Sequence, residues 1–483
     1  MGGNPARNGL SQYLGPLVEP GGEPELYWSG GESAVIGSMP TIEGDKLILS
    51  RRWPSASQTE SWIISYNVYD GTELWKVTLP LDPESDHYAK VSGVDSEHVY
   101  ATRAGGYYSP SWLIALNIET GEVVWQSEEK VTEYDFETAT FRENGDLIIG
   151  NQDEILCISK DDGSTLWTLS RETWSGGDGS SVAAYGNRGY YWDQAPGTID
   201  MVVSACDLET GEHLFYSDAI STSSMQAQQS GLLAGPDGTV YAPRSNSVPE
   251  FDSIVSLSDK GDHFEENWRY PIGFVNFCSH GVGPDNTVYT YSRDREVIRL
   301  DPASGSVLNT SIVICNGDMS FFPWIAIGDD GMVYLVVEDY PFYKLYFFTP
   351  ELELLWGEEI FKMRGVALGD SVLVVNGKND IRAYKGRPNP GVGITDLIET
   401  NNQLTVYPNP SNGIYTIALD PEQQLANASI EVINIAGQLV YSADIKSATH
   451  THLHIDISDQ IDGLYVIRYF SGNNYHIQKI IKQ

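Results

Sequence analysis

The chain has 483 residues, with 66 acidic against 29 basic side chains and a net charge of −37. Such a surface repels phosphate backbones, which argues against nucleic acid binding, and no apolar run approaches the length of a membrane span. The 47 Gly, 12 Trp and 28 Tyr, without a long helical pattern, favour an all-β fold with many turns. The length predicts more than one domain.

The beginning of the chain has little regular pattern. Residues 1–23 are rich in Gly and Pro and lack alternation. Met1-Gly2-Gly3 has neither the basic nor the apolar run of a signal peptide, so we expect a signal peptide to be absent from this chain. Glu25–Gly30 then has the pattern of the outermost strand of a repeat that has not yet begun.

The segment Leu116–Trp125 shows the unit that recurs along the chain. A strand leads into the turn Glu119-Thr120-Gly121, where Gly is free to take a positive φ, and Trp125 lies in the next strand. The equivalent position recurs every 41 to 53 residues, at Trp28, Trp75, Trp125, Trp167, Phe215, Trp268, Asn309 and Trp356. An interval of this length suits four short strands, the size of one propeller blade.

These repeats predict seven complete blades and one incomplete blade. Their expected spans are Ser38–Thr78, Lys90–Ser127, Asp135–Ser170, Ser181–Ser217, Gln228–Pro271, Ser279–Ile314, Ser320–Glu359 and Lys362–Gly386. The last has three strand candidates but lacks the Trp-bearing fourth. We predict that Glu25–Gly30 supplies it, so that the fold is an eight-bladed β-propeller closed by an N-terminal strand.

The recurring aromatic residue is expected to pack each blade against the next. Burying ~150–250 Å² of such a side chain contributes roughly 4–6 kcal/mol before entropy is subtracted, which explains the repeat without a ligand. Asp237, Asp285 and Asp330 each precede a second strand, and they lack the dense spacing of a calcium loop. We interpret them as turn residues.

The four cysteines do not make the framework of a disulfide-rich domain. All four are expected to be plain core or loop residues, and Cys157 and Cys206 occur at similar points of neighbouring repeats, inside the third strand. A disulfide between Cys278 and Cys315, near the starts of two adjacent blades, stays open as the alternative.

Residues 1–386 resemble the pyrroloquinoline-quinone-enzyme-like β-propeller repeat family. The resemblance rests on Gly3-Asn4-Pro5-Ala6-Arg7-Asn8-Gly9 and on the repeats typified by Ala115–Trp125. In its dehydrogenases the family implies a cofactor-stacking Trp, calcium ligands and a catalytic Asp, but that constellation is not matched here position by position. Relatives with only the repeats are mostly binding or scaffold proteins.

A propeller binds ligands most readily where the loops entering the innermost strands converge. Aromatic and amide side chains there would suit a sugar or a peptide. The candidate residues are Tyr88, Tyr134, Trp174, Asp178, Gln226, Gln228, His280, Trp324 and Arg364. Their alternative interpretation is that they are ordinary loop and channel-filling residues.

The pattern changes after the propeller. Residues 387–402 read as a linker, because Pro388 and Pro390 stop strand pairing. Residues 403–483 hold seven short alternating strands, which predict a small immunoglobulin-like β-sandwich. His450, His452 and His454 share one strand face, which could hold a metal, but we interpret them as an exposed face and predict no metal site.

This last segment resembles the type A C-terminal sorting domain of the type IX secretion system of Bacteroidetes. Four blocks carry the resemblance: Val406–Gly413, Ile433–Tyr441, Asp462–Tyr469 and Gln478–Lys482. The residues assigned to the sorting motif are Tyr407, Pro408, Asn409, Pro410, Gly413, Gly437, Gly463, Tyr465, Lys479 and Lys482. The resemblance implies passage through the periplasm, recognition by the outer-membrane translocon, and release or surface attachment.

Together these patterns predict a secreted or cell-surface propeller that binds a glycan or protein ligand or acts as a scaffold. The alternative is an enzyme at the propeller funnel, either quinone-dependent or glycan-active. No cofactor is required by the residues: the acidity permits calcium, whereas pyrroloquinoline quinone is not expected.

Overall fold

The computed structural model separates the chain into two compact units, Met1–Asn389 and Pro390–Gln483, which are considered one at a time. It describes residues 4, 7–19, 22–31, 35–36, 39–52, 61–81, 87–104, 109–132, 139–150, 153–171, 181–198, 200–220, 231–244, 253–272, 279–316, 323–339, 342–360, 363–377, 381–388, 405–418, 428–434, 439–445, 452–458, 460–461, 463–471 and 474–483. These residues include no helix with the length and apolar character needed to cross a bilayer.

The described strands of the first unit form eight antiparallel sheets, numbered here in chain order. Sheet 1 holds β2 (Val35–Ile36), β3 (Thr41–Glu43), β4 (Lys46–Arg52), β5 (Ser61–Asn67) and β6 (Glu73–Val77). Sheet 2 holds β7 (Lys90–Val94), β8 (His98–Thr102), β9 (Ser111–Asn117) and β10 (Val123–Val131). Sheet 3 holds β11 (Thr140–Phe141), β12 (Leu147–Gly150), β13 (Glu154–Ile158) and β14 (Thr165–Ser170). Sheet 4 holds β15 (Ala183–Tyr185), β16 (Arg188–Gln194), β17 (Met201–Asp207) and β18 (His213–Tyr216).

The remaining sheets follow the same order. Sheet 5 holds β19 (Leu233–Ala234), β20 (Val240–Arg244), β21 (Ser253–Asp259) and β22 (Phe264–Pro271). Sheet 6 holds β23 (Gly281–Val282), β24 (Val288–Tyr291), β25 (Glu296–Leu300) and β26 (Val307–Val313). Sheet 7 holds β27 (Trp324–Ile327), β28 (Val333–Asp339), β29 (Phe342–Phe348) and β30 (Leu354–Ile360). Sheet 8 holds β31 (Met363–Gly369), β32 (Val372–Gly377) and β33 (Ile381–Lys385), with β1 (Leu26–Gly30) at its outer edge.

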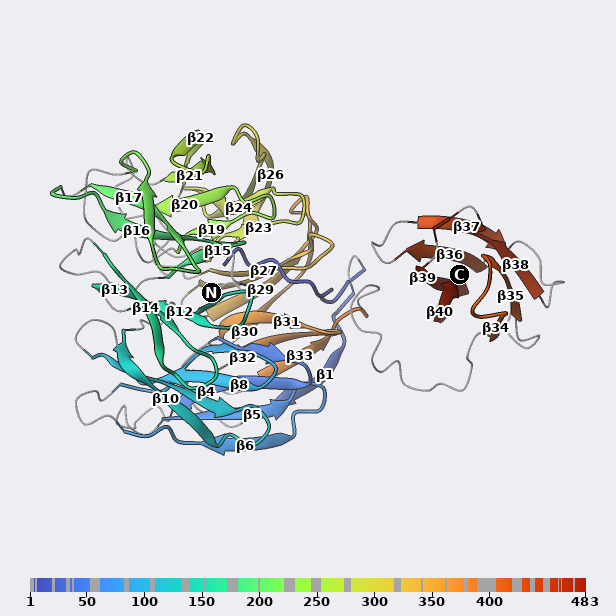
Figure 1. Cartoon of the computed structure of the whole chain (residues 1–483), viewed down its shortest axis with the longest axis horizontal. Coiled ribbons are helices and arrows are strands. Elements are labelled where there is room, and N and C mark those ends of the chain that lie inside the picture. Colours follow the sequence, from blue (N-terminus) through green and yellow to red (C-terminus); the bar gives the residue numbers. More distant parts are fainter. Residues whose placement is uncertain are drawn as a thin grey trace. The chain divides into compact units, whose positions relative to one another are not determined.

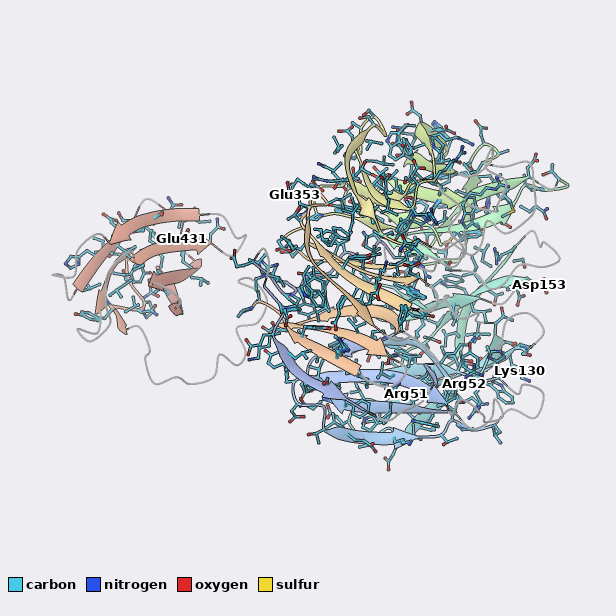
Figure 2. All side chains as sticks on the ribbon, turned by 180° about the vertical axis from the view of Figure 1, so that it is seen from behind. Arg51, Arg52, Lys130, Asp153, Glu353 and Glu431 are labelled. Atoms are coloured by element: carbon cyan, nitrogen blue, oxygen red, sulfur yellow. The ribbon has the colours of Figure 1, made fainter. Side chains whose placement is uncertain are left out.

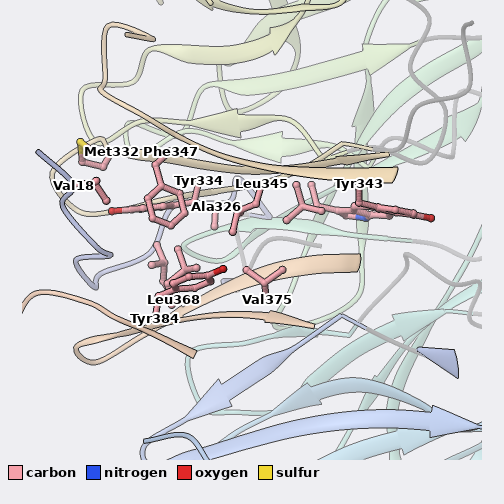
Figure 3. Packing of buried hydrophobic residues seen from close by; sticks show 13 residues of the cluster. Val18, Ala326, Met332, Tyr334, Tyr343, Leu345, Phe347, Leu368, Val375 and Tyr384 are labelled. Carbon is pink, nitrogen blue, oxygen red and sulfur yellow. The ribbon is translucent and has the colours of Figure 1, made fainter. Parts of the chain in front are cut away.

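Each sheet packs face to face on its neighbours around a ring (Figure 1). A separate hydrophobic cluster fills each interface between consecutive sheets, as Figure 3 shows for sheets 7 and 8, where the ring centres of Phe347 and Tyr384 are 6.0 Å apart. One further cluster, with Leu49 and Val374, joins sheet 1 to sheet 8 and closes the ring. This arrangement is that of a β-propeller.

The predicted N-terminal strand is confirmed. β1 pairs antiparallel with β33, with Ser29 opposite Arg382 and Gly30 opposite Ile381. Because β1 precedes sheet 1 and β33 belongs to sheet 8, the two ends of the ring are joined by backbone hydrogen bonds. The outer edge of β33 is therefore covered.

The recurring Trp and the recurring turn Gly form one contact. The Trp75 indole N–H donates to the Ile118 carbonyl oxygen at 2.8 Å, and a Cβ at Gly121 would lie 2.7 Å from the Trp75 ring. Gly121 has a φ of 71°, so it both makes the turn and leaves room for the ring of the preceding sheet. The same pairing joins Trp28 to Gly71, Trp125 to Gly163, Trp167 to Gly211 and Trp268 to Gly305.

The pair between sheets 6 and 7 departs from this rule at both residues. Asn309 takes the place of the Trp, opposite Arg299. In sheet 7 the corresponding turn carries Leu352, which has a φ of 65° and is buried. A larger side chain at the turn therefore accompanies the loss of the indole ring, as close packing requires.

The cysteine and turn predictions can be compared with the described residues. Cys157 and Cys206 are buried in the same cluster between sheets 3 and 4, which agrees with the expectation that they are plain core or loop residues. Cys315 is a buried free thiol, while Cys278 lies outside the described residues. Asp237 accepts a hydrogen bond from the Thr239 amide at 3.0 Å, as a turn residue does.

The second unit holds two sheets. One contains β34 (Thr405–Tyr407), β35 (Ile414–Ala418) and β38 (His452–Asp456), and the other β37 (Leu439–Ile445), β36 (Ala428–Asn434), β39 (Gly463–Ser471) and β40 (Asn474–Lys482). Tyr415 and Ile455 from the first share a core with Val432, Ile467 and Ile480 from the second. The two sheets therefore face each other across one hydrophobic layer.

Candidate functional site

The candidate site lies at one end of the propeller sheets, which we call the rim. The first strands of neighbouring sheets contact one another, so they are the innermost strands of the ring. In an antiparallel sheet the start of the first strand and the end of the second lie at the same end. The rim is therefore made by the starts of the first strands and the ends of the second strands.

Tyr88 lies on the rim between sheets 1 and 2, in a group of basic side chains. The Arg52 guanidinium, at the end of β4, lies 4.4 Å from the centre of the Tyr88 ring. The Lys90 ammonium, at the start of β7, lies 5.3 Å from the same centre, and the His87 ring lies at 4.5 Å. Tyr88 is 7% exposed, so its ring is largely covered by these neighbours.

Arg103 fixes the segment that carries Tyr88. It donates to the carbonyl oxygens of His87 at 3.0 Å and of Leu79 at 3.3 Å. Ser61, which begins β5, accepts from the Ala89 amide at 2.7 Å and from Arg103 at 3.4 Å. Arg103 is 1% exposed and acts as a positioning residue for the rim rather than as an exposed cation.

Buried polar residues recur at the ends of the second strands. Arg51 precedes Arg52 and points the other way, toward sheet 8, where it donates to the Gly377 carbonyl oxygen at 3.4 Å. Figure 2 labels this arginine pair at the end of β4. The other members of the set, all buried, are Arg103, Asp193, Arg244 and Asn376.

His280 and Trp324 lie on the rim of sheets 6 and 7 and are buried. His280 Nδ1 lies 2.9 Å from Thr290 Oγ1, and the centre of its ring lies 5.6 Å from that of Tyr291. Complete burial lowers the pKa of His280 to about 3, so the imidazole is neutral at neutral pH. Trp324 is 3% exposed and belongs to the cluster between sheets 7 and 8.

The other funnel residues named from the sequence cannot be placed in the site. Arg364 lies in β31, and its side chain is outside the described part of the structure. Five residues lie outside the described ranges: Tyr134, Trp174, Asp178, Gln226 and Gln228. Of the nine candidate residues, His280 and Trp324 lie on segments that are joined directly. The Ser279 amide donates to the Pro323 carbonyl oxygen at 3.0 Å.

The N-terminal segment lies against the innermost strands of sheets 5, 6 and 7. The Asn8 side-chain amide donates to the Ala234 carbonyl oxygen at 2.7 Å, and the Asn8 carbonyl oxygen accepts from Val282 at 2.9 Å. Gly9 accepts from the Ile327 amide at 2.8 Å. In Figure 1 the dark blue chain runs beside β23 and β27. Part of the centre of the ring is therefore occupied by the chain's own backbone.

Sequence reasoning missed both the arginine positions and this segment. The sequence does carry a signal for the arginine positions. Arg51, Arg103 and Arg244 each stand near the end of the second strand of a repeat, in a chain with few basic residues. For the N-terminal segment, Asn8 and Gly9 belong to a pattern that resembles the repeat family, and this pattern does not indicate their contacts. Nothing local in the sequence indicates contacts with residues more than 200 positions away.

The described residues can be compared with the side chains that most often hold a metal ion. Among them, no three His, Cys, Asp or Glu side chains gather closely enough to hold a metal ion. His454 contacts Thr416 Oγ1 at 3.1 Å and is exposed. The side chain of His452 and all of His450 lie outside the described part of the chain.

The sorting motif has a defined geometry in the second unit. Asn409 Oδ1 accepts from the Ile481 amide at 2.8 Å, and Ser411 makes backbone hydrogen bonds of 2.9 Å with Ile481 and Gln483. Gly413 has a φ of 104° and packs on Ser458, where a Cβ would lie 2.6 Å away. Among the other motif residues, Tyr465 is buried, Gly437 lies outside the described ranges, and the Lys479 side chain is not described.

Two family profiles match the chain. Residues 59–311 match the family described as outer membrane protein assembly factor BamB, and residues 405–483 match the secretion system C-terminal sorting domain. A domain of the second kind indicates a secreted or cell-surface protein. No curated protein sequence matches the chain significantly.

Solved structures with low sequence identity resemble the chain, and the first two given below share its fold. BamB from Moraxella catarrhalis is 14% identical with a TM-score of 0.53, covering 75% of this chain and 100% of that one. The C-terminal WD40 domain of Sif2 is 9% identical with a TM-score of 0.53, covering 77% and 99%. PorZ of Porphyromonas gingivalis, an essential bacterial surface component of the type-IX secretion system, is 11% identical with a TM-score of 0.45, covering 96% and 72%.

Proposed function

Since the chain belongs to the family described as outer membrane protein assembly factor BamB, we propose that its propeller is a binding or scaffold module. The second unit directs the protein through the type IX secretion system of a Bacteroidetes cell, by way of the periplasm, to the medium or the outer surface. The partners are the translocon, for the second unit, and a glycan or protein ligand, for the propeller. The domains are residues 1–386, a linker at 387–402 and a sorting domain at 403–483.

The finer fold assignment belongs to the same proposal. Eight sheets joined by a continuous series of interfaces support an eight-bladed propeller. Two facing sheets with one core support an immunoglobulin-like sandwich for the second unit. In a propeller a ligand would bind at the rim, and in a sandwich a partner would bind on the outer surface.

The observation that carries the binding role is the N-terminal segment at the centre of the ring. Backbone groups of Val282 and Ile327 on the innermost strands are bonded to Asn8 and Gly9. A reaction centre or cofactor in this part of the ring would have to displace these hydrogen bonds. We place the ligand at the rim around Tyr88, Arg52 and Lys90, where an aromatic ring and basic side chains meet.

The binding role is tested with ligand arrays on the full chain. Glycan and peptide arrays should identify a ligand, and Tyr88→Ala and Arg52→Ala should weaken its binding by roughly tenfold or more. Tyr185→Ala, at the exposed end of β15 in sheet 4, is the matched control and should bind normally. Equal binding by all variants would refute the rim assignment.

The enzyme alternative is tested separately. We expect the full chain to give no thermal shift and no new visible absorbance with pyrroloquinoline quinone and calcium. Stoichiometric, calcium-dependent binding, together with reduction of a dye that depends on an added oxidisable substrate, would replace the binding role by a dehydrogenase.

The export role is tested by deletion. Removing residues 405–483 should retain the protein inside cells that carry the secretion system.

A further inference from the structure

Arg52, on the rim of the propeller, differs from other arginines in its partners. Elsewhere in the described residues, arginines pair with Asp or Glu side chains, as do Arg142, Arg188, Arg269, Arg299, Arg382 and Arg387. Arg52 forms no ion pair and no side-chain hydrogen bond with any residue that the structure describes, and its Nε is buried. A partly buried guanidinium without a carboxylate is costly, so this group is suited to an anion from outside the chain.

The surrounding residues hold the Arg52 guanidinium in place. Arg52 ends β4, where it is paired with Val35 of β2 on one side and with Ser61 of β5 on the other. Its guanidinium lies 4.4 Å from the centre of the Tyr88 ring. The Ser61 hydroxyl accepts from the Ala89 amide at 2.7 Å, so the residue opposite Arg52 also holds the segment that carries Tyr88. A group held in this way loses little conformational freedom when a ligand binds.

The described charges of sheets 1 and 2 differ between their two ends. At the rim, the Lys90 ammonium lies 5.3 Å from the centre of the same Tyr88 ring, so this ring has two cations beside it. The turns at the opposite end of these two sheets carry carboxylates: Asp45, Asp70, Asp95, Glu97, Glu119 and Glu122. Within the described part of sheets 1 and 2, an anion at the rim therefore meets cations first.

The chemistry of this group favours a carboxylate on a sugar. A cation–π contact uses no hydrogen-bond acceptor, so the N–H donors of Arg52 remain for a carboxylate, which the planar guanidinium binds in a bidentate manner. The net charge of −37 disfavours a densely charged polymer, whereas a glycan separates its carboxylates by neutral groups. The partly exposed His87 ring, 4.5 Å from that of Tyr88, offers an apolar face to the C–H groups of a sugar.

We propose that the rim binds an acidic glycan, in which a uronic acid carboxylate pairs with the Arg52 guanidinium. This inference rests on the binding role proposed above and names the class of its ligand. Tyr88 and Ser61 are positioning residues, because the first contacts the guanidinium and the second fastens the segment of the first to β5.

The first experiment compares acidic glycans with their methyl esters by calorimetric titration of the full chain. The probes are oligosaccharides of galacturonate, glucuronate and mannuronate, each with a fully methyl-esterified counterpart that keeps the sugar rings and loses the charge. At least one acidic form should bind roughly tenfold or more tightly than its ester, because the ester cannot form the ion pair. This comparison uses the unchanged protein, so it does not depend on how any variant folds.

The second experiment assigns the carboxylate to Arg52. Arg52→Gln should weaken binding of the acidic form by roughly tenfold or more and leave binding of the ester unchanged, and Arg52→Lys, which keeps the charge without the planar fork, should lie between. Lys76→Gln is the matched control. The Lys76 side chain is exposed and its ammonium lies 4.1 Å from the centre of the Trp62 ring, so it is also a cation beside an aromatic ring of sheet 1. That variant should bind the acidic form like the unchanged protein.

The outcomes distinguish this inference from the binding role. If acid and ester bind equally, or if Arg52→Gln binds the acidic form normally, the pairing with a carboxylate is wrong while the binding role stands. If a neutral glycan or an acidic peptide binds at the rim and no uronic acid glycan does, the ligand class is wrong. If no glycan or peptide binds in a way that depends on Tyr88, the binding role at the rim itself is wrong.

Discussion

At the scale of single residues, the propeller is organised by a Trp on one sheet and a Gly on the next. The Trp125 indole donates to the Lys160 carbonyl oxygen at 2.8 Å and lies over Gly163. The Gly has two functions, because its positive φ makes the turn and its missing Cβ admits the ring. A sequence shows the first function through the turn pattern, but only the packed sheets show the second.

Gly121→Ala tests this double role. The new Cβ would lie 2.7 Å from the Trp75 ring, on a backbone with a φ of 71°. We expect the free energy of unfolding to fall by about 2–4 kcal/mol, from the left-handed conformation and from overpacking together. Chemical denaturation at equilibrium measures this change.

Gly261→Ala is the matched control for that measurement. Gly261 lies in the turn between β21 and β22 of sheet 5 with a φ of 98°, and a Cβ added there would have no atom within 4 Å. Only the conformational cost of about 1–2 kcal/mol is expected there. Equal losses in the two variants would show that the Trp contact is not what requires Gly at position 121.

His280 predicts a specific dependence of stability on pH. Its pKa is about 3 in the folded protein because of burial and near its ordinary value of 6.5 when unfolded. The unfolded chain therefore binds the proton first, so stability is fully present above pH 6.5 and is lost as the pH falls toward 3. One such group contributes a slope of about 1.4 kcal/mol per pH unit.

The measurement compares the urea midpoint at pH 6.5 and pH 5, above the range in which most carboxyl groups titrate. The unchanged protein should lose stability over this interval, and His280→Asn should lose less. Parallel losses in both proteins would assign the pH dependence to other groups.

At the scale of elements, the N-terminal 30 residues join the ring in two ways. β1 completes sheet 8, while the preceding segment bonds to β23 and β27. Between them, the Tyr334 hydroxyl donates to the Pro16 carbonyl oxygen at 2.8 Å, and the Arg387 guanidinium donates to Gly15 at 3.0 Å and pairs with Asp330. The segment thus ties sheets 6, 7 and 8 to one another.

Deleting residues 1–30 should sharply lower the melting temperature, since it exposes the edge of β33 and removes the central contacts. Deleting only residues 1–11 should lower it less, because β1 remains to pair with β33. Differential scanning calorimetry of the two shortened chains and the full chain checks this order. A full-chain melting temperature in the longer deletion would contradict closure by β1.

At the scale of the whole molecule, the net charge of −37 opposes compaction. Many of the described ion pairs are at the surface, such as Lys260 with Glu265, and contribute little. Salt should therefore screen more repulsion than attraction.

We expect the melting temperature to rise between low ionic strength and about 0.5 M sodium chloride, as the Debye length falls below ~10 Å. Sodium chloride is suitable because sulfate would also strengthen hydrophobic burial. A lower melting temperature in salt would mean that ion pairs such as Lys344 with Asp339 outweigh the net repulsion.

The strands, the turns and the β1 pairing could be predicted because their signals are local and repeat. Trp28 could be assigned to an outer strand from its neighbours alone, and the missing strand of the last repeat left one place for it. The candidate site was harder. Tyr88, His280 and Trp324 do lie on the rim, but their burial, the Arg52 contact and the role of Arg103 depend on side chains from other sheets.

The sequence by itself determined the repeat, the all-β class and the sorting motif, because each is written in residues close together along the chain. Only the tertiary structure decided that Asn8 and Gly9 lie on the innermost strands, and that Ser411 meets Lys482. Those contacts join backbone groups far apart in sequence, and a backbone amide carries no residue-specific signal. Their partners are chosen by how whole sheets pack, which no short stretch of sequence encodes.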